Sequence, residues 1–77
     1  MNKTIEEFKE EISYSKKIKE NLLNNLTKQK EREIILNIFS VEYDFFNKKV
    51  IIYYYVKDKD YPSTELSFED FKKMIVG

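Results

Sequence analysis

FSVEYDFFNKKVIIYYYV, residues 39–56, is the segment whose pattern most strongly predicts the fold of this chain. It is rich in Val, Ile, Phe and Tyr, which suit the pleated surface of a sheet. Apolar and polar residues alternate from Phe39 onward, and Asn47-Lys48-Lys49 interrupts the apolar run. This interruption predicts a hairpin turn in which Asn47 takes the left-handed conformation. We therefore expect two antiparallel strands, over residues 34–46 and 49–57.

The pairing of these strands follows from how their side chains divide between two faces. If Phe45 lies opposite Val50, one face of the hairpin becomes wholly apolar. That face carries the pairs Phe39/Val56, Val41/Tyr54, Tyr43/Ile52 and Phe45/Val50. The second face carries Ser40/Tyr55, Glu42/Tyr53 and Asp44/Ile51, and upstream it includes Ile34, Leu36 and Ile38. The second face is thus expected to be apolar at one end and acidic at the other.

Helices are expected on both sides of the hairpin in the sequence. Apolar residues recur at helical spacing from Ile5 to Leu26 and predict a helix over residues 4–29, begun by a capping box of Thr4 and Glu7. Ser15 interrupts the apolar stripe, so the helix either continues through residues 13–15 or breaks there into two. Ser67 is typical of an N-cap and predicts a second helix over residues 68–76. The fold class is α+β, in the order α-β-β-α, as a single domain over residues 1–77 with both helices on the apolar face of the hairpin.

The composition excludes several chemistries. The chain has no cysteine and no histidine, so disulfides, Cys/His zinc sites and histidine-dependent catalysis cannot be built. The one glycine is the last residue, which leaves no glycine-rich phosphate loop. We expect no enzyme activity, no catalytic residues, no cofactor and no metal.

Glu42 and Asp44 are the most suggestive acid pair. Two residues apart on a strand, they share a face at a separation of about 7 Å, which could serve glycoside hydrolysis or hold a divalent cation. The interpretation we favour is a solvated sheet edge, where carboxylates discourage aggregation.

Charge and hydropathy restrict the partners and the location. The 14 basic and 14 acidic residues are spread evenly along the chain, which disfavours both a nucleic-acid-binding protein and an acidic DNA mimic. Lysines between residues 16 and 30 could contact nucleic acid, but Glu20 and Glu31 lie among them.

The apolar run from Val50 to Val56 is far below the roughly 20 residues that span a bilayer, and the polar, acidic amino terminus is unlike a signal peptide. We expect a cytoplasmic protein without membrane contact.

The run Tyr53-Tyr54-Tyr55 is the strongest indication of a binding surface. Alternation directs Tyr54 toward the helices and leaves Tyr53 and Tyr55 on the second face with Ile51. Tyrosine is enriched at protein interfaces, where one end of a residue is dry and the other wet. Either part of the first helix folds over this face, or another molecule covers it. The candidate partner-binding residues are Tyr53, Tyr55, Ile51, Glu42 and Asp44.

These features together predict a small non-enzymatic protein-binding module, an inhibitor or regulator of a larger protein. More than half of the residues are Lys, Asn, Ile, Tyr or Phe, and alanine is absent, which indicates AT-rich codons. A phage or other mobile element of a low-GC bacterium is therefore the expected source. An inhibitor of a host defence protein, of the anti-CRISPR kind and active in the host cytoplasm, is one instance. The alternatives are a homodimer that buries the second face against its own copy and, less favoured, a nucleic-acid-binding accessory protein.

Overall fold

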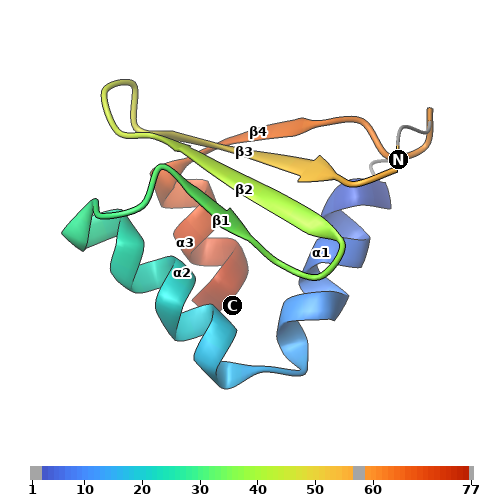
Figure 1. Cartoon of the computed structure of the whole chain (residues 1–77), viewed down its shortest axis with the longest axis horizontal. Helices are drawn as coiled ribbons and strands as arrows, with labels where there is room; N and C mark the ends of the chain where they lie inside the picture. Colours follow the sequence, from blue (N-terminus) through green and yellow to red (C-terminus); the bar gives the residue numbers. More distant parts are fainter. Residues whose placement is uncertain (1–2, 57–58, 77) are drawn as a thin grey trace.

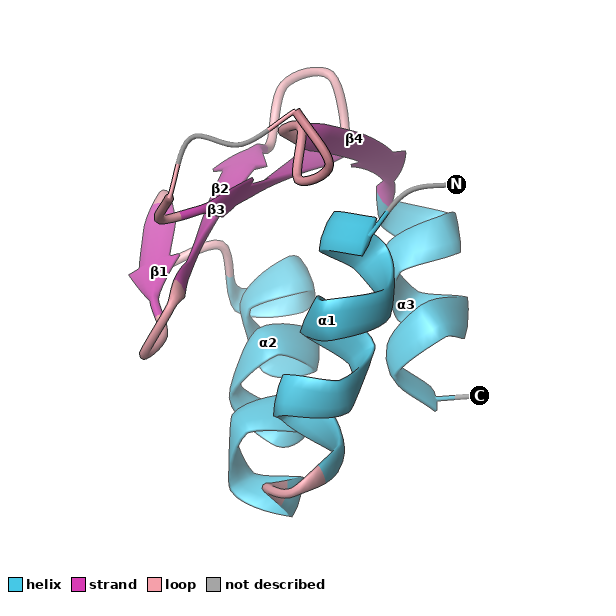
Figure 2. Ribbon diagram, turned by 90° about the vertical axis from the view of Figure 1, so that its right-hand side faces the viewer, coloured by secondary structure: helices cyan, strands magenta, loops and turns pink. Residues whose placement is uncertain are grey.

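The computed structural model describes residues 3–56 and 59–76, which form three helices and a four-stranded antiparallel sheet (Figure 1). The elements are α1 (Lys3–Ser13), α2 (Lys16–Lys28), β1 (Glu33–Ile35), β2 (Phe39–Asp44), β3 (Lys49–Tyr54), β4 (Thr64–Ser67) and α3 (Phe68–Val76). The strands lie in the order β1-β2-β3-β4, and the helices pack on one side of the sheet (Figure 2). The α+β class expected from the sequence is confirmed.

The first helical segment breaks in two, which settles the alternative left open at residues 13–15. Ser15 is extended (φ −137°, ψ 105°), and its hydroxyl oxygen accepts a hydrogen bond from the Ile18 N–H at 3.2 Å. This bond satisfies a free N–H at the start of α2, as an N-cap should. The predicted capping box places Thr4 at the start of the helix, but α1 begins at Lys3, so Thr4 lies inside its first turn. The buried Thr4 hydroxyl donates to the Pro62 carbonyl at 2.7 Å, which ties α1 to the segment before β4.

The strand predicted over residues 34–46 is two strands joined by a tight turn. The Leu36 N–H donates to the Phe39 carbonyl at 2.8 Å, so the chain reverses and β1 pairs with β2. The reversal places Ile34 opposite Val41, where it packs against the core. Leu36 and Ile38 also pack against the core. The expectation that these three residues extend the second face was therefore wrong.

The hairpin register differs from the predicted one by two residues. Phe39 lies opposite Tyr54 and Val41 opposite Ile52, because Asp44 and Lys49 close the loop. A shift of two preserves the face on which each side chain lies, so the predicted division into faces holds within β2 and β3. The left-handed residue is Lys48 (φ 55°) and not Asn47. Lys57, the end of the predicted second strand, lies outside the described residues.

The fourth strand was not predicted. Residues Thr64–Ser67 pair with Ile52–Lys49 and extend the sheet beyond the hairpin. Only four residues pair there, which is too short a run for an alternation pattern to be read. The predicted N-cap at Ser67 is confirmed, since its hydroxyl oxygen accepts a hydrogen bond from the Asp70 N–H at 3.0 Å.

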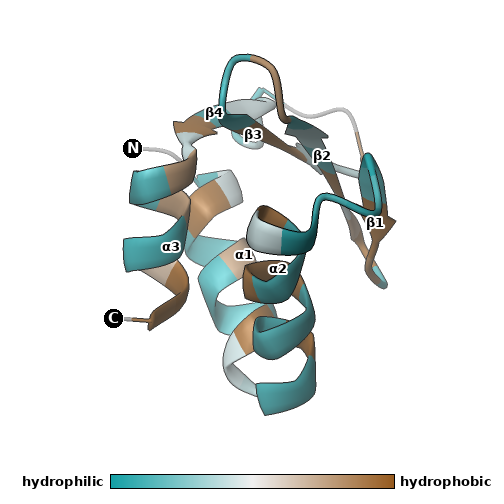
Figure 3. Ribbon diagram, turned by 90° about the vertical axis from the view of Figure 1, so that its left-hand side faces the viewer, coloured by the Kyte–Doolittle hydropathy of each residue, from teal (hydrophilic) through white to brown (hydrophobic). Residues whose placement is uncertain are grey.

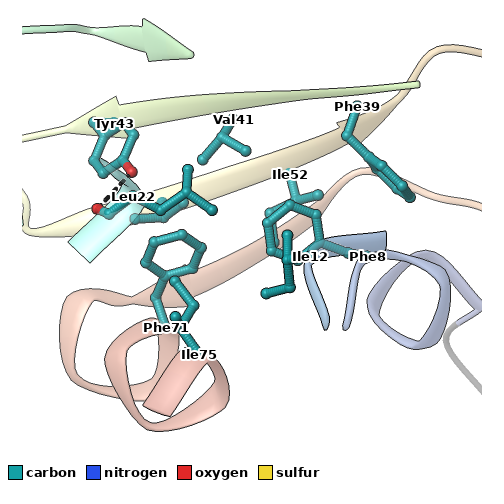
Figure 4. Close-up of a cluster of buried hydrophobic side chains, with 10 residues drawn as sticks. Phe8, Ile12, Leu22, Phe39, Val41, Tyr43, Ile52, Phe71 and Ile75 are labelled. Atoms are coloured by element: carbon teal, nitrogen blue, oxygen red, sulfur yellow. Dashed lines mark hydrogen bonds between the residues drawn. The ribbon is translucent and has the colours of Figure 1, made fainter. Parts of the chain in front are cut away.

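The core lies between the helices and the inner face of the sheet (Figure 4). Apolar and polar residues are interleaved along each helix, as expected of helices with one buried side (Figure 3). Phe8 packs edge-on against Phe39 with ring centroids 5.4 Å apart, and Phe71 does the same against Tyr43 at 6.0 Å. The buried residues of the core are Phe8, Ile12, Leu22, Phe39, Val41, Tyr43, Val50, Ile52, Phe71 and Ile75.

A buried polar contact links α2 to the sheet. The Tyr43 hydroxyl donates to the Leu22 carbonyl at 2.9 Å, drawn as the dashed line in Figure 4. Among the described residues, every buried side-chain nitrogen or oxygen has a hydrogen-bond partner. Within the described residues, the core on the helical side of the sheet therefore has no buried side-chain polar group left to be satisfied from outside.

Candidate functional site

The side of the sheet that faces away from the helices is here called the outer face. α1 and α2 both pack on the other side, since Phe8, Ile12 and Leu22 belong to the same core (Figure 2). The alternative in which part of the first helix folds over the second face was therefore wrong. The outer face consists of Glu33, Ile35, Ser40, Glu42, Asp44, Lys49, Ile51, Tyr53, Glu65 and Ser67.

The strand register arranges these side chains in rows across the sheet. Glu33 lies opposite Glu42, which lies opposite Ile51. Glu65 continues the row on the other side of Ile51. Because neighbouring strands are about 4.8 Å apart, this row extends over about 14 Å. An aliphatic side chain thus lies among three carboxylates.

A second row is apolar and aromatic. Ile35, Ser40 and Tyr53 lie side by side in it, with Ile35 76% exposed and Tyr53 38% exposed. Tyr55 follows the end of β3 and is 75% exposed, and its backbone N–H donates to the Ile38 carbonyl at 3.0 Å. The fold places Ile51, Tyr53 and Glu42 together on the outer face, as the sequence predicted. Tyr55 lies just beyond the end of β3, with its ring centroid 6.1 Å from that of Tyr54.

Tyr53 and Glu42 lie beside each other on the outer face and interact. Partial desolvation, the negative charge of Glu42 and a hydrogen bond with Glu42 raise the pKa of the Tyr53 phenol, and Glu33 adds to the effect. The phenol therefore stays neutral over the physiological range. A neutral phenol presents both an apolar ring and a hydroxyl donor, which suits a surface that becomes partly dry on contact.

Asp44 has a structural contact that the sequence did not reveal. Its carboxylate accepts hydrogen bonds from the Asn47 backbone N–H at 3.0 Å and the Asn47 side-chain amide at 2.8 Å. These bonds lower the pKa of Asp44 and hold the hairpin loop. Over residues 3–56 and 59–76, no group of three or more acidic side chains is arranged to hold a metal ion.

Phe46 is an exposed residue that the sequence analysis missed. It lies on the hairpin loop and is 93% exposed. It borders a hollow of about 380 Å³ lined by Arg32, Glu42, Tyr43, Asp44, Phe45, Phe46 and Ile51. Phe45 packs against Tyr43. Adjacent residues on a strand point in opposite directions, so the position of Phe46 directly after Phe45 in the predicted strand was a signal for this exposure.

Ile35 and Glu65 were missed for a different reason. The single strand predicted over residues 34–46 implied that Ile35 shares the apolar face with Phe39, but the reversal after β1 places Ile35 on the outer face. Glu65 lies on β4, which was not predicted, so its face could not be assigned.

The opposite end of the sheet has a second hollow of about 540 Å³, to which Tyr53 contributes. Tyr54 and Tyr61, stacked with ring centroids 4.4 Å apart, also line this hollow.

The fold separates charges that are evenly mixed in the sequence. The outer face has four carboxylates against one ammonium group, a net charge of −3. The ammonium group, Lys49, forms an ion pair with Glu65 at 2.7 Å. α2, on the other side of the molecule, has four lysines and one glutamate, a net charge of +3. The balance along the chain therefore does not extend to the surface.

No helix within the described residues is long and apolar enough to cross a bilayer. The comparisons with known proteins gave no relative: no family model, curated protein or solved structure matches this chain.

Proposed function

We propose that this chain is a small protein-binding module that docks on a larger protein through the outer face of its sheet. The main support is that Ile51 and Tyr53 lie in the middle of a sheet face that no described helix covers. Exposed apolar side chains that cluster on one face, with polar groups around them, are typical of protein interaction sites.

The hairpin loop adds a candidate anchor to this face. Phe46 projects from a loop that the Asp44–Asn47 hydrogen bonds hold in one shape. Because the loop that carries Phe46 is already ordered, binding has to fix only the two torsions of its side chain, and this small loss of conformational freedom favours affinity. Aromatic residues are also over-represented among the residues that dominate binding energy.

Inhibition or regulation of the larger protein is the role we propose for this contact. A module that covers part of a partner's surface can block it without catalysis, and the chain has no histidine or cysteine for histidine- or cysteine-dependent catalysis. The amino-acid composition, which is the kind that AT-rich codons encode, supports a mobile element as the source, with a host defence protein in the cytoplasm as the kind of target.

Affinity capture with matched variants tests the docking face. Tagged wild-type protein, Tyr53→Ala with Tyr55→Ala, and Tyr14→Ala with Val76→Ala are each incubated with a lysate of the host bacterium. The control pair removes two exposed apolar side chains from the helical side of the molecule. We expect the wild type and the control to retain the same protein, and the tyrosine variant to lose it with an unchanged circular dichroism spectrum. If both variants retain the partner protein equally, the tyrosine side of the outer face is excluded as the docking site.

Sedimentation velocity tests the self-association alternative. The proposal requires a monomer at micromolar concentration. A dimer that dissociates on the Tyr53→Ala with Tyr55→Ala change would show that the face binds a second copy, and would replace the proposed function.

A further inference from the structure

We infer that the surface bound by the outer face is rich in arginine and lysine around an apolar patch, and belongs to a different protein. This inference rests on the proposed function, because it specifies the partner of the same face. It follows from the placement of charge on the sheet and from the side chains that lie between the charges.

The first observation is a like-charge pair in register. Glu33 and Glu42 are directly opposite each other on β1 and β2, with both side chains on the outer face. Like charges in this position destabilise a sheet. Within residues 3–56 and 59–76, neither glutamate forms an ion pair. Glu33 accepts a hydrogen bond from the Ser40 hydroxyl at 2.6 Å, and Glu42 is hydrogen-bonded with Tyr53. A partner that brings positive charge to this place would remove the repulsion.

The second observation is the extent of the negative charge. Glu65 lies on the far side of Ile51 from Glu42, so carboxylates flank the apolar centre on both sides. One positive group of the face, Lys49, is already paired with Glu65, and Arg32 stands at the edge of the hollow near Glu42. Among the described residues Glu33, Glu42 and Asp44 form no ion pair, so the face remains negative around Ile51.

The third observation is the kind of side chain available to meet a cation. Tyr53 and Phe46 are exposed aromatic rings at the two ends of the Ile51 region. An arginine guanidinium can stack on an aromatic ring while it hydrogen-bonds a carboxylate. The apolar contact supplies affinity, and the charge complementarity gives specificity and a faster association rate.

A second copy of this chain does not fit the same face. A two-fold axis through the outer face would bring its net charge of −3 against an identical charge. Like-charge contacts across an interface cost binding energy. The basic helix α2 of another copy could lie on the outer face only in a head-to-tail arrangement, which forms open filaments unless the rotation closes a ring. We therefore commit to a different, basic protein surface.

Two synthetic peptides serve as probes. One is a short amphipathic helix with arginine on one side and leucine on the other, and its twin has glutamate at each arginine position. Binding is measured by fluorescence anisotropy, and the contact is mapped by amide chemical shifts of labelled protein. The charge variant is Glu33→Gln with Glu42→Gln. The matched control, Glu10→Gln with Glu20→Gln, makes the same change in net charge on exposed positions of α1 and α2.

We expect the arginine peptide to bind at the outer face and the glutamate peptide not to bind. The charge variant should weaken binding about tenfold or more, which corresponds to about 1.4 kcal/mol, and the control should change it little. Raising the NaCl concentration from about 20 mM to about 200 mM should also weaken it, since screening shortens the reach of exposed charges. The charge variant should unfold at the same urea concentration as the wild type or a higher one, because a repulsion is removed.

Several results would overturn the inference: equal weakening by the charge variant and the control, equal binding of both peptides, shifts centred on α2, or no peptide binding. The Tyr53→Ala with Tyr55→Ala variant separates this inference from the proposed function. If the protein retained in the lysate capture is lost by the tyrosine variant but kept by the charge variant, the docking face stands and the basic partner is excluded. If the tyrosine variant retains the same protein as well as the wild type does, docking through the tyrosine side of the outer face is excluded before the charge of the partner is in question.

Discussion

Replacement of Asn25 by alanine should destabilise the fold, although the same replacement at Asn24 should not. Asn25 is 6% exposed, and its side chain binds the backbone of Glu31 twice. The amide donates to the Glu31 carbonyl at 2.8 Å, and the amide oxygen accepts from the Glu31 N–H at 2.9 Å. These bonds hold the segment that leads from α2 into β1, and β1 supplies Glu33 and Ile35 to the outer face.

The expected size of the effect follows from the two lost bonds. A buried hydrogen bond contributes about 0.5–1.5 kcal/mol net, so their loss should cost about 1–3 kcal/mol. Alanine raises helix propensity by up to about 0.7 kcal/mol relative to asparagine, but it does so at both positions. The difference between the two variants therefore measures what the buried Asn25 side chain contributes through Glu31 and through its hydrogen bond with Tyr43. For a domain of this size, about 2 kcal/mol lowers the melting temperature by about 8–16 °C.

Urea denaturation followed by circular dichroism measures both free energies of unfolding. The account requires Asn25→Ala to be less stable than Asn24→Ala by at least about 1 kcal/mol, with similar slopes against urea. Equal stabilities would show that the contact between α2 and the Glu31 backbone contributes nothing to the fold.

Three further predictions concern other polar contacts. Tyr43→Phe should lose about 1 kcal/mol at neutral pH with the bond to the Leu22 carbonyl. Burial raises the pKa of Tyr43 above its unfolded value near 10, so the wild type should lose this contribution to stability as pH rises above about 10. Urea denaturation across alkaline pH should therefore show a shrinking difference in stability between the wild type and Tyr43→Phe. Hydrogen bonds from Asn47 lower the pKa of Asp44, so its contribution is present above about pH 4 and is lost as pH falls through the folded-state pKa. The Asn47 amide resonance should move in that range in the wild type, and a resonance that shows the same transition in Asp44→Ala would contradict this assignment. Thr4→Val removes the bond to the Pro62 carbonyl and should cost about 1–2 kcal/mol in a urea melt, whereas the exposed Thr27→Val should be nearly neutral.

The sequence predicted those parts of the fold that depend on local pattern. Alternation from Phe39 to Asp44 and from Val50 to Tyr54 was long enough to assign the inner and outer faces correctly. The exact pairing was not predicted, because a shift of two residues leaves both faces chemically the same. The loop chemistry decides between the two registers, and there the Asp44–Asn47 hydrogen bonds select the observed one.

Two strands, β1 and β4, could not be predicted from local sequence pattern. β1 and β4 have three and four residues, and their position depends on pairing partners elsewhere in the chain. Without them, neither Ile35 nor Glu65 could be placed on the outer face, and the row of carboxylates around Ile51 could not be foreseen. The separation of charge was hidden for the same reason, because it exists only after β1 and β4 are added to the hairpin.

Nitration of tyrosines in the complex tests the docking face most directly. Tyr55 and Tyr14 are similarly exposed in the free protein. Tyr14 belongs to the connection between α1 and α2. Figure 2 shows that this connection is at the end of the helices away from the sheet. The purified partner from the capture experiment is added, and nitration by tetranitromethane is located by mass spectrometry. The account predicts that Tyr53 and Tyr55 become protected while Tyr14 reacts as before. Protection of Tyr14 with continued reaction of Tyr53 and Tyr55 would contradict it.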